Sequence, residues 1–373
     1  MTDKNELEEK TDRVVGFLET NNLGGILLNA QHNFAWLTSG GTNGIDLSRE
    51  AGVGTLLVRH DGRRFILANN IEMPRLLAEE LNASAWEPIK FAWEAEKANA
   101  ALVAEQAQSV LETDLPLASD LPCGAAQVVE GKFARLRYQL TEPEIERFRS
   151  LGRDSGEAIG ELARAVAPGL SEQEVARRAV DALNARGAHS VVTLVAADER
   201  ISNFRHPVPT AKRWEKLLMF VVCARRQGLI TSLTRIVCRG SIPDELRRKT
   251  LAPARVNAKL LAATRPGATG GDLFGVIARA YADEGFAGEE RLHHQGGAAG
   301  YRTREWVAHP HSTEQVQTHQ AFAWNPSITG TKVEETCIAF ADHCEIITAS
   351  PDWPAIAVEI DGRRYHLPDV LSI

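Results

Sequence analysis

Residues 220–240 constrain the fold more than any other part of the chain. They contain two apolar runs, 220–223 and 229–237, separated by the polar segment 225–228, which ends in glycine. A glycine there can adopt a positive φ, which the tight turn of a β-hairpin often requires. The pattern therefore predicts two buried strands joined by a turn at 225–228. Paired strands of this kind hold their side chains rigidly, as an active site requires.

Composition places the chain among ordinary globular proteins. Its 373 residues are enough for two domains, and 44% of them are hydrophobic while 24% are charged. The formal net charge of −7 gives no basic surface for nucleic acid. The first residues are polar, no apolar run is long enough for a membrane span, and the five cysteines are scattered without a CxxC spacing. We therefore expect a cytoplasmic protein with reduced thiols and no nucleic-acid or membrane partner.

The first part of the chain alternates between strand and helix patterns. The expected elements are a helix at 5–20, strands at 25–30, 52–59 and 63–67, and helices at 73–81 and 95–111. Asp61-Gly62 is the expected turn between the second and third strands. This alternation predicts an α/β N-terminal domain.

Helix-start signals recur in the second part of the chain. Residues 141–144, Thr-Glu-Pro-Glu, form a capping box with proline in the first turn, which predicts a helix to about residue 166. A Pro-Gly pair followed by a second helix-start pattern occupies 168–174, and a similar segment occurs 98 residues later at 266–272. The two segments predict an internal repeat of loop, N-cap and amphipathic helix.

The hairpin also resembles a known family. In metal-dependent members of the pita-bread superfamily (creatinase, Xaa-Pro aminopeptidase, prolidase and methionine aminopeptidase) it reads Asp-x-Gly-Ala-x4-Gly-Tyr-x-Ser-Asp-x-Thr-Arg. This chain keeps Ala224, Gly228 and Thr234-Arg235 of that pattern. The two aspartates of the pattern bind a dinuclear metal centre, and their positions carry Val221 and Ser232 here.

The resemblance implies the architecture. It predicts a creatinase-like α/β N-terminal domain at 1–135 and an α+β pita-bread catalytic domain at 136–373. A pita-bread domain is a curved antiparallel sheet covered by helices, and its two halves are related by a pseudo-twofold axis. The internal repeat suits this architecture. The segment 33–38 resembles the family's Asn-x-x-Tyr-Leu-Thr, so Trp36 either reaches a substrate pocket or packs in the core. The resemblance also implies a homodimer in which the partner's N-terminal domain closes the catalytic cleft.

The remaining metal positions are mostly replaced as well. When the family pattern is aligned on Gly300, Gly297 falls at the position of the histidine that binds metal. Asn325 occupies the position of the glutamate in the pattern Val-Glu-Pro-Gly. Only Glu334 is kept, followed by Glu335. Valine, serine, glycine and asparagine cannot supply the anionic ligands that two dications need. The sequence therefore predicts no metal and no cofactor, so Glu334 should pair with a histidine, Arg235, Lys332 or a cationic substrate.

The resemblance also implies roles for the polar residues. His206, in the segment 203–210, matches the general base of creatinase, and His293 matches a substrate-contacting histidine, so both join Glu334 as expected catalytic residues. Glu334 is expected to bind a cationic guanidinium or ammonium group, with Arg235 holding it in place. The expected substrate contacts are Asn325, Ser232, Arg235, His294, Trp36, Tyr301, Arg304 and Glu335.

The sequence thus predicts a metal-independent, creatinase-like hydrolase or lyase that acts on an amidino or amide C–N bond of a small polar molecule. Two alternatives stay open. One is a non-catalytic pseudoenzyme that binds a peptide or a protein. The other is an atypical Xaa-Pro aminopeptidase-like metallohydrolase, in which His293 or His294 holds a single metal ion together with Glu334.

Overall fold

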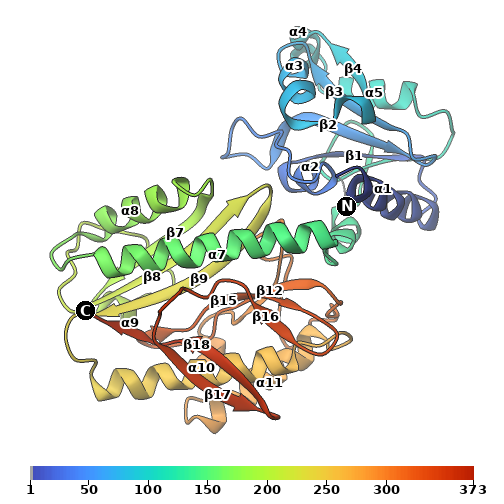
Figure 1. Ribbon diagram of the computed structural model, residues 1–373. Helices are drawn as coiled ribbons and strands as arrows, with labels where there is room; N and C mark the ends of the chain where they lie inside the picture. The colour runs from blue at the N-terminus through green and yellow to red at the C-terminus, as the bar shows by residue number, and fades with distance from the viewer. Residues whose placement is uncertain (1–2) are drawn as a thin grey trace. The chain divides into compact units, whose positions relative to one another are not determined.

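The computed structural model describes residues 3–373 and divides into two compact units, one ending at Arg137 and one spanning Tyr138–Ile373 (Figure 1). Within the described residues, no helix is both long enough and apolar enough to cross a membrane.

The first unit is built on a six-stranded mixed sheet with the order β4-β3-β2-β1-β5-β6. The strands are β1 (Gly25–Ala30), β2 (Ala51–Arg59), β3 (Arg64–Asn69), β4 (Glu87–Phe91), β5 (Leu117–Ser119) and β6 (Gln127–Val128). β2 pairs antiparallel with β1 and β3, whereas β4, β5 and β6 join their neighbours in parallel. The turn expected at Asp61-Gly62 joins β2 to β3, and Gly62 has a φ of 83°.

The helices of this unit are α1 (Asp3–Thr20), α2 (Gln31–Leu37), α3 (Met73–Arg75), α4 (Trp93–Ala98), α5 (Leu102–Ser109) and α6 (Glu130–Phe133). A single helix at 95–111 was expected, but α4 and α5 are separate. The side chain of Asn99 accepts a hydrogen bond from the Ala101 amide at 2.9 Å and donates one to Glu105 at 2.8 Å. Asparagine competes in this way with helical backbone bonding, so the helix ends and restarts.

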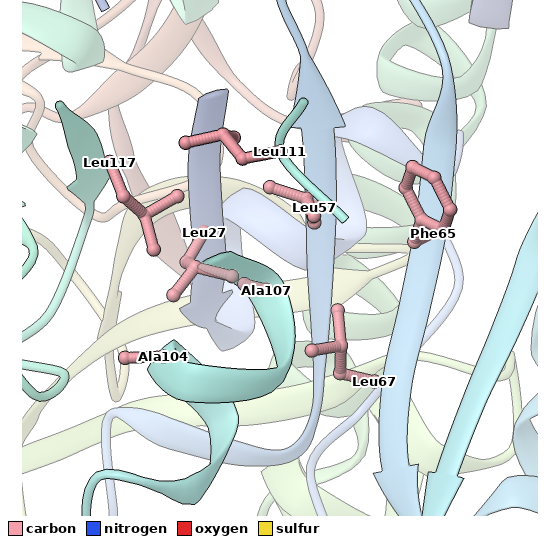
Figure 2. Close-up of a cluster of buried hydrophobic side chains, with 8 residues drawn as sticks. All are labelled: Leu27, Leu57, Phe65, Leu67, Ala104, Ala107, Leu111 and Leu117. Atoms are coloured by element: carbon pink, nitrogen blue, oxygen red, sulfur yellow. The ribbon is translucent and has the colours of Figure 1, made fainter. Parts of the chain in front are cut away.

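The core of the first unit lies between the sheet and α5. Figure 2 shows its side chains, which are Leu27, Leu57, Phe65, Leu67, Ala104, Ala107, Leu111 and Leu117. Trp36 of α2 is fully buried in this unit and stacks edge-to-face on Phe133 at 5.7 Å between ring centroids. The expectation that Trp36 contacts substrate is therefore wrong, because the apolar face of α2 packs it into the core.

The second unit contains a four-stranded and a five-stranded sheet, with the orders β19-β9-β8-β7 and β11-β10-β12-β15-β16. The first sheet consists of β7 (His189–Ala197), β8 (Leu217–Arg226), β9 (Leu229–Cys238) and β19 (Val370–Ser372). The second consists of β10 (Gly296–Ala299), β11 (Trp306–Val307), β12 (Gln320–Trp324), β15 (Glu335–Ala339) and β16 (Cys344–Ile346). Two further strand pairs are β13 (Ser327–Ile328) with β14 (Thr331–Lys332), and β17 (Ala355–Ile360) with β18 (Arg363–Pro368).

The helices of the second unit are α7 (Glu142–Ala165), α8 (Glu172–Asn184), α9 (Arg200–Asn203), α10 (Asp244–Ala263) and α11 (Gly270–Asp283). Of these, α7, α8 and α11 begin at the capping signals expected from the sequence, whereas α9 and α10 have no side-chain cap. Complete capping boxes precede α7, α8 and α11. The predicted repeat is thus confirmed as local structure, since α8 and α11 start in the same way. α7 and α8 pack on the four-stranded sheet (Figure 1).

The β8–β9 hairpin brings the two sheets of this unit together. Its turn is the predicted one, with Gln227 at φ 50° and Gly228 at φ 81°. The Ser232 amide donates to the Thr336 hydroxyl at 2.7 Å, and the Thr234 amide donates to the Glu334 carbonyl at 3.3 Å. β9 therefore lies directly beside the start of β15.

Candidate functional site

Glu334 stands at the centre of the polar groups in the second unit. It lies between β14 and β15, and only 2% of the residue is exposed. The Lys332 ammonium lies 2.8 Å from Oε2, the Thr234 hydroxyl donates to Oε2 at 2.7 Å, and Arg304 Nη2 donates to Oε1 at 3.4 Å. Burial alone would raise the pKa of Glu334, but the two cations outweigh it and lower the pKa to about 2. Glu334 is therefore a carboxylate whose charge is already compensated within the chain.

Arg235 is not a partner of Glu334, so that expected pair is wrong. Its Nη1 lies 2.9 Å from Glu335 Oε1, its Nε donates to the Ser350 hydroxyl at 2.9 Å, and its Nη2 donates to the Thr348 carbonyl at 2.7 Å. Successive residues of an extended segment point to opposite faces, so Glu335 points away from the groups that surround Glu334. Arg235 and Glu335 form a separate buried pair, which gives neither residue the substrate contact that was expected.

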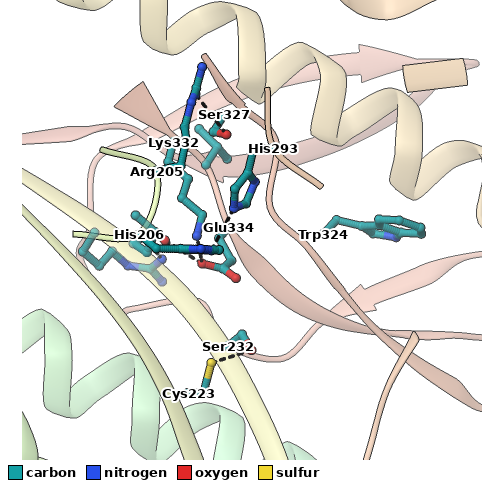
Figure 3. Close-up of polar contacts among 12 residues, drawn as sticks. Arg205, His206, Cys223, Ser232, His293, Trp324, Ser327, Lys332 and Glu334 are labelled. Atoms are coloured by element: carbon teal, nitrogen blue, oxygen red, sulfur yellow. Dashed lines mark hydrogen bonds and ion pairs between the residues drawn. The ribbon is translucent and has the colours of Figure 1, made fainter. Parts of the chain in front are cut away.

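Three histidines gather beside Glu334. His206 lies in the loop after α9, and His293 and His294 lie just before β10. The Nε2 atoms of His206 and His293 are 3.0 Å apart, and the rings of His293 and His294 stack with centroids 4.4 Å apart. In Figure 3 the side chains of His206, His293 and Lys332 converge on Glu334, whereas Trp324 points away. The structure thus brings together the three expected catalytic residues, together with His294.

Polar contacts position the loops that carry these rings. Arg205, next to His206, pairs with Glu289 and donates to the Ser327 hydroxyl at 3.3 Å. The Gln295 side-chain amide donates to the His293 carbonyl at 2.6 Å. The Arg205 contacts join segments far apart in sequence and hold the His206 loop to the segment just before His293, whereas the Gln295 contact is local and positions the His293 main chain.

All three imidazoles are neutral near pH 7. Loss of hydration in this partly enclosed cluster lowers the pKa of His206, and it lowers that of His293 to about 3 and that of His294 to about 4. The positive charges of Lys332 and Arg304 act in the same direction. In a neutral pair 3.0 Å apart, one ring donates its Nε2 proton and the other accepts it. The arrangement can therefore accept a proton from a group beside it and return it.

The remaining expected residues have different surroundings. Ser232 is buried, with its hydroxyl 3.2 Å from Cys223 Sγ and 3.4 Å from Arg304 Nη1, so it lies at the edge of the Glu334 group. Asn325 is buried, and its Oδ1 has no hydrogen-bond partner within residues 3–373. The Tyr301 hydroxyl donates to Glu144 at 2.7 Å, which is a buried contact with α7.

Thr234 is the site residue that the sequence reasoning missed. Its hydroxyl contacts Glu334, although it was noted only as part of the retained Thr-Arg motif. Alternation along β9 was the available signal, because Ser232 and Thr234 are two residues apart and share a face of the strand.

The residues present do not fit the dinuclear metal centre implied by the resemblance. Val221 packs in a hydrophobic cluster and has no ligand atom. At Gly297 a Cβ would lie 2.0 Å from the Trp306 carbonyl oxygen, so no side chain can extend from that position without moving backbone. The carboxylate of Glu334, the one acidic residue kept, is engaged by Lys332 and Thr234.

Comparisons with known proteins agree with this fold. The model of Metallopeptidase family M24 matches residues 146–348. An Xaa-Pro dipeptidase from Bacillus anthracis superposes with a TM-score of 0.76 at 17% identity, covering 98% of this chain and 100% of that one. Dipeptidase PepE from Mycobacterium ulcerans gives 0.78 at 14% identity with 100% of both chains covered. A prolidase from Pyrococcus horikoshii gives 0.74 at 19% identity, covering 92% of this chain and 98% of that one.

No curated protein sequence matches the chain significantly. Because the sequence identities to these solved structures are so low, the structural matches establish the fold and nothing more. Together with the family model they confirm the predicted resemblance, and with it an α/β N-terminal domain followed by an α+β pita-bread domain.

Proposed function

Because the chain belongs to metallopeptidase family M24, we propose that it hydrolyses an amide-type or amidino C–N bond of a small molecule, and that it does so without the two metal ions of that family. The single observation that carries this proposal is the set of contacts around Glu334. Lys332 and Arg304 pair with Glu334, which is the one carboxylate kept at the metal-ligand positions of the family.

These charges also define the substrate class. Lys332 and Arg304 carry two positive charges, Glu334 carries one negative charge, and the histidines are neutral, so one positive charge is in excess. Such a site favours a carboxylate on the substrate or a developing oxyanion. We therefore replace the cationic substrate group expected from the sequence with an anionic one, and Glu334 becomes a positioning residue for Lys332.

In the proposed reaction His206 acts as general base. It takes a proton from a water molecule as the water oxygen attacks the carbon of the C–N bond, and His293 bonds to it through Nε2 at 3.0 Å. When the attacked carbon belongs to an amide, Lys332 and Arg304 stabilise the negative charge that develops on the carbonyl oxygen. When the C–N bond breaks, His206 returns the proton to the leaving nitrogen, which leaves as an amine.

A substrate screen with chelator-treated protein tests this proposal. Amino acids acylated or amidinated on nitrogen are compared with matched compounds whose carboxylate is converted to an amide, and release of the amine is measured. We expect hydrolysis of carboxylate compounds only. In the Lys332→Met variant kcat/KM should fall roughly 10²–10³-fold, as for the loss of one group that stabilises an oxyanion. The His206→Asn variant should lose proton transfer, which lowers kcat more than it raises KM.

Lys259→Met serves as the matched control. Lys259 lies on α10 and pairs with Asp283 at 2.7 Å, so this variant removes a lysine while leaving the Glu334 group unchanged. Hydrolysis that appears only after Mn²⁺ or Co²⁺ is added would overturn the proposal in favour of the atypical metallohydrolase. No hydrolysis of any compound, together with stabilisation by a peptide, would favour the non-catalytic alternative.

The expected homodimer stays a prediction. Light scattering during gel filtration checks it, since a dimer has twice the chain mass of 40.8 kDa.

A further inference from the structure

We propose that His206, His293 and His294 form a binding site for one divalent transition-metal ion of the Zn²⁺ or Co²⁺ type, separate from the dinuclear centre of the family. The metal site itself rests on geometry alone. Its consequence, which is inhibition by the bound ion, rests on the proposed function. A neutral imidazole that coordinates an ion through one nitrogen carries its proton on the other nitrogen, so a coordinated His206 can no longer accept a proton from water.

The spacing of the ring nitrogens suits such an ion. One nitrogen from each histidine lies within 4.8 Å of the nitrogens of the other two, and the Nε2 atoms of His206 and His293 are 3.0 Å apart. Zinc–nitrogen bonds of about 2.0–2.1 Å in a tetrahedral site imply neighbouring nitrogens roughly 3.3 Å apart. Small side-chain rotations would therefore complete a three-histidine site, with the fourth position left for water.

The exposure of the rings permits an ion to enter. His206 and His294 are exposed and His293 is half-buried, so an ion can reach all three without any opening of the fold. The Nδ1 atom of His293 is buried, and the described chain offers it no hydrogen-bond partner. That ring can therefore change its orientation without breaking a bond at Nδ1.

The donor set selects the class of metal. Three neutral imidazoles suit Zn²⁺, Co²⁺, Ni²⁺ and Cu²⁺, whereas Mg²⁺, Ca²⁺ and Mn²⁺ prefer oxygen ligands. Glu334 does not join the set, because its carboxylate is engaged by Lys332, Thr234 and Arg304. This distinguishes the site from the single-metal alternative considered above, in which Glu334 was a ligand.

The neighbouring cations set the strength of binding. Lys332 and Arg304 repel a dication, and Glu334 offsets only one of their charges. Removing the Lys332 charge should therefore strengthen metal binding, whereas it should weaken binding of a carboxylate substrate. Opposite effects of one substitution on two ligands are a demanding test of this charge arrangement.

The experiment titrates chelator-treated full-length protein with Co²⁺ and follows the visible absorption of the tetrahedral ion, with Zn²⁺ calorimetry in parallel. We expect one ion per chain. His206→Asn, His293→Asn and His294→Asn should each weaken Co²⁺ binding by roughly 100-fold. Lys332→Met should strengthen it several-fold. Circular dichroism and thermal melting confirm that each variant is folded. His206→Asn and His294→Asn should perturb the fold least, because both rings are exposed.

A matched control comes from a second pair of exposed histidines. The His311 amide donates to His309 Nδ1 at 3.2 Å, so these residues are also neighbours. His309→Asn/His311→Asn should leave Co²⁺ binding unchanged. Co²⁺ binding that is equal in the wild-type protein and the His206, His293 and His294 variants would overturn the site, and so would the absence of saturable binding.

Activity assays then separate the two proposals. Stoichiometric Zn²⁺ binding that inhibits the chelator-treated enzyme supports both. Binding at the three histidines that activates the enzyme supports the metal site and refutes the metal-independent reaction. Hydrolysis by the chelator-treated protein without any histidine-dependent metal binding supports the proposed function and refutes the metal site.

Discussion

Glu334 and Glu335 are neighbours in sequence, yet the structure gives them opposite surroundings. Both are almost fully buried, with 2% and 3% exposed, and both pair with a cation of the protein. Two cations and a hydroxyl lower the pKa of Glu334 to about 2. Burial raises the pKa of Glu335, and Arg235 and Thr348 only partly offset it. The number of cations around a buried carboxylate, rather than burial itself, therefore decides its ionisation here.

The two carboxylates also differ in what their cations can do. Arg235 is 1% exposed, and its remaining donors bond to Ser350 and to two main-chain carbonyls. It crosslinks β9 to the segment that follows β16, so its role is structural. Lys332 and Arg304 instead pair with the carboxylate of Glu334, and Lys332 lies beside the histidine cluster, in which His206 and His294 are exposed (Figure 3).

The largest expected effect comes from breaking the structural pair. Arg235→Met leaves Glu335 buried without its cation, and such a change lowers the free energy of unfolding by about 3–5 kcal/mol. Urea denaturation followed by circular dichroism measures it.

The double variant Arg235→Met/Glu335→Leu is the control for that effect. Replacing both partners by apolar residues of similar volume should recover most of the loss. A single variant within 1 kcal/mol of the wild-type protein would contradict the structural role of the pair.

The next largest expected effect is on the pH dependence of the free energy of unfolding, to which Glu334 and Glu335 should contribute with opposite sign. The pKa of Glu334 falls from 4.5 to about 2 on folding, so its stabilisation is complete above 4.5 and is lost as the pH falls towards 2. The shift corresponds to about 3 kcal/mol, and Glu334→Gln should remove that part of the acid sensitivity. For Glu335 the sign is reversed. Its raised pKa favours the folded state below 4.5, and that contribution is lost as the pH rises through the folded value.

Urea denaturation at several pH values between about 2 and 6 measures both contributions. If Glu334→Gln and Glu335→Gln change the pH profile in the same direction, the contrast between the two residues is wrong.

A smaller effect tests the hydrogen bond to Glu334. Thr234→Val keeps the β-branched shape but removes the hydroxyl that donates to Glu334 at 2.7 Å. The free energy of unfolding should fall by about 1.5 kcal/mol, because the acceptor is charged. Thr231→Val on the same strand is the comparison, since its hydroxyl contacts the neutral Ser155 hydroxyl at 3.1 Å. Its expected cost is nearer 0.5–1 kcal/mol. Equal costs measured by thermal and urea denaturation would show that the charge of Glu334 adds nothing to the bond.

Local chemistry made much of the fold predictable. The turn at Gln227-Gly228 and the capping boxes before α7, α8 and α11 depend on residues within a few positions of one another, so the sequence contained the whole signal. The break between α4 and α5 was missed because one asparagine side chain outweighed a helical pattern.

Strand alternation accounts for one part of the candidate site, whereas the histidines were expected from the family resemblance and not from any local rule. Lys332 and Glu334 are two residues apart on an extended segment, and Lys332 was among the expected partners. The same alternation argues against Arg235 as a partner of Glu334, because Arg235 follows Thr234 on β9 and so points to the opposite face of the strand. By contrast, the approach of His206 to His293 spans 87 residues and depends on loop positions that no local rule describes.

The close approach of Gly297 to the Trp306 carbonyl restricts how this sequence can change. A histidine at that position would need β10 and β11 to move apart first, because the obstructing atom belongs to the backbone rather than to a flexible side chain. No single substitution can therefore rebuild a family-type ligand at this position. A library of point variants should consequently yield new specificities around Lys332 and the histidines more readily than a return to two-metal catalysis.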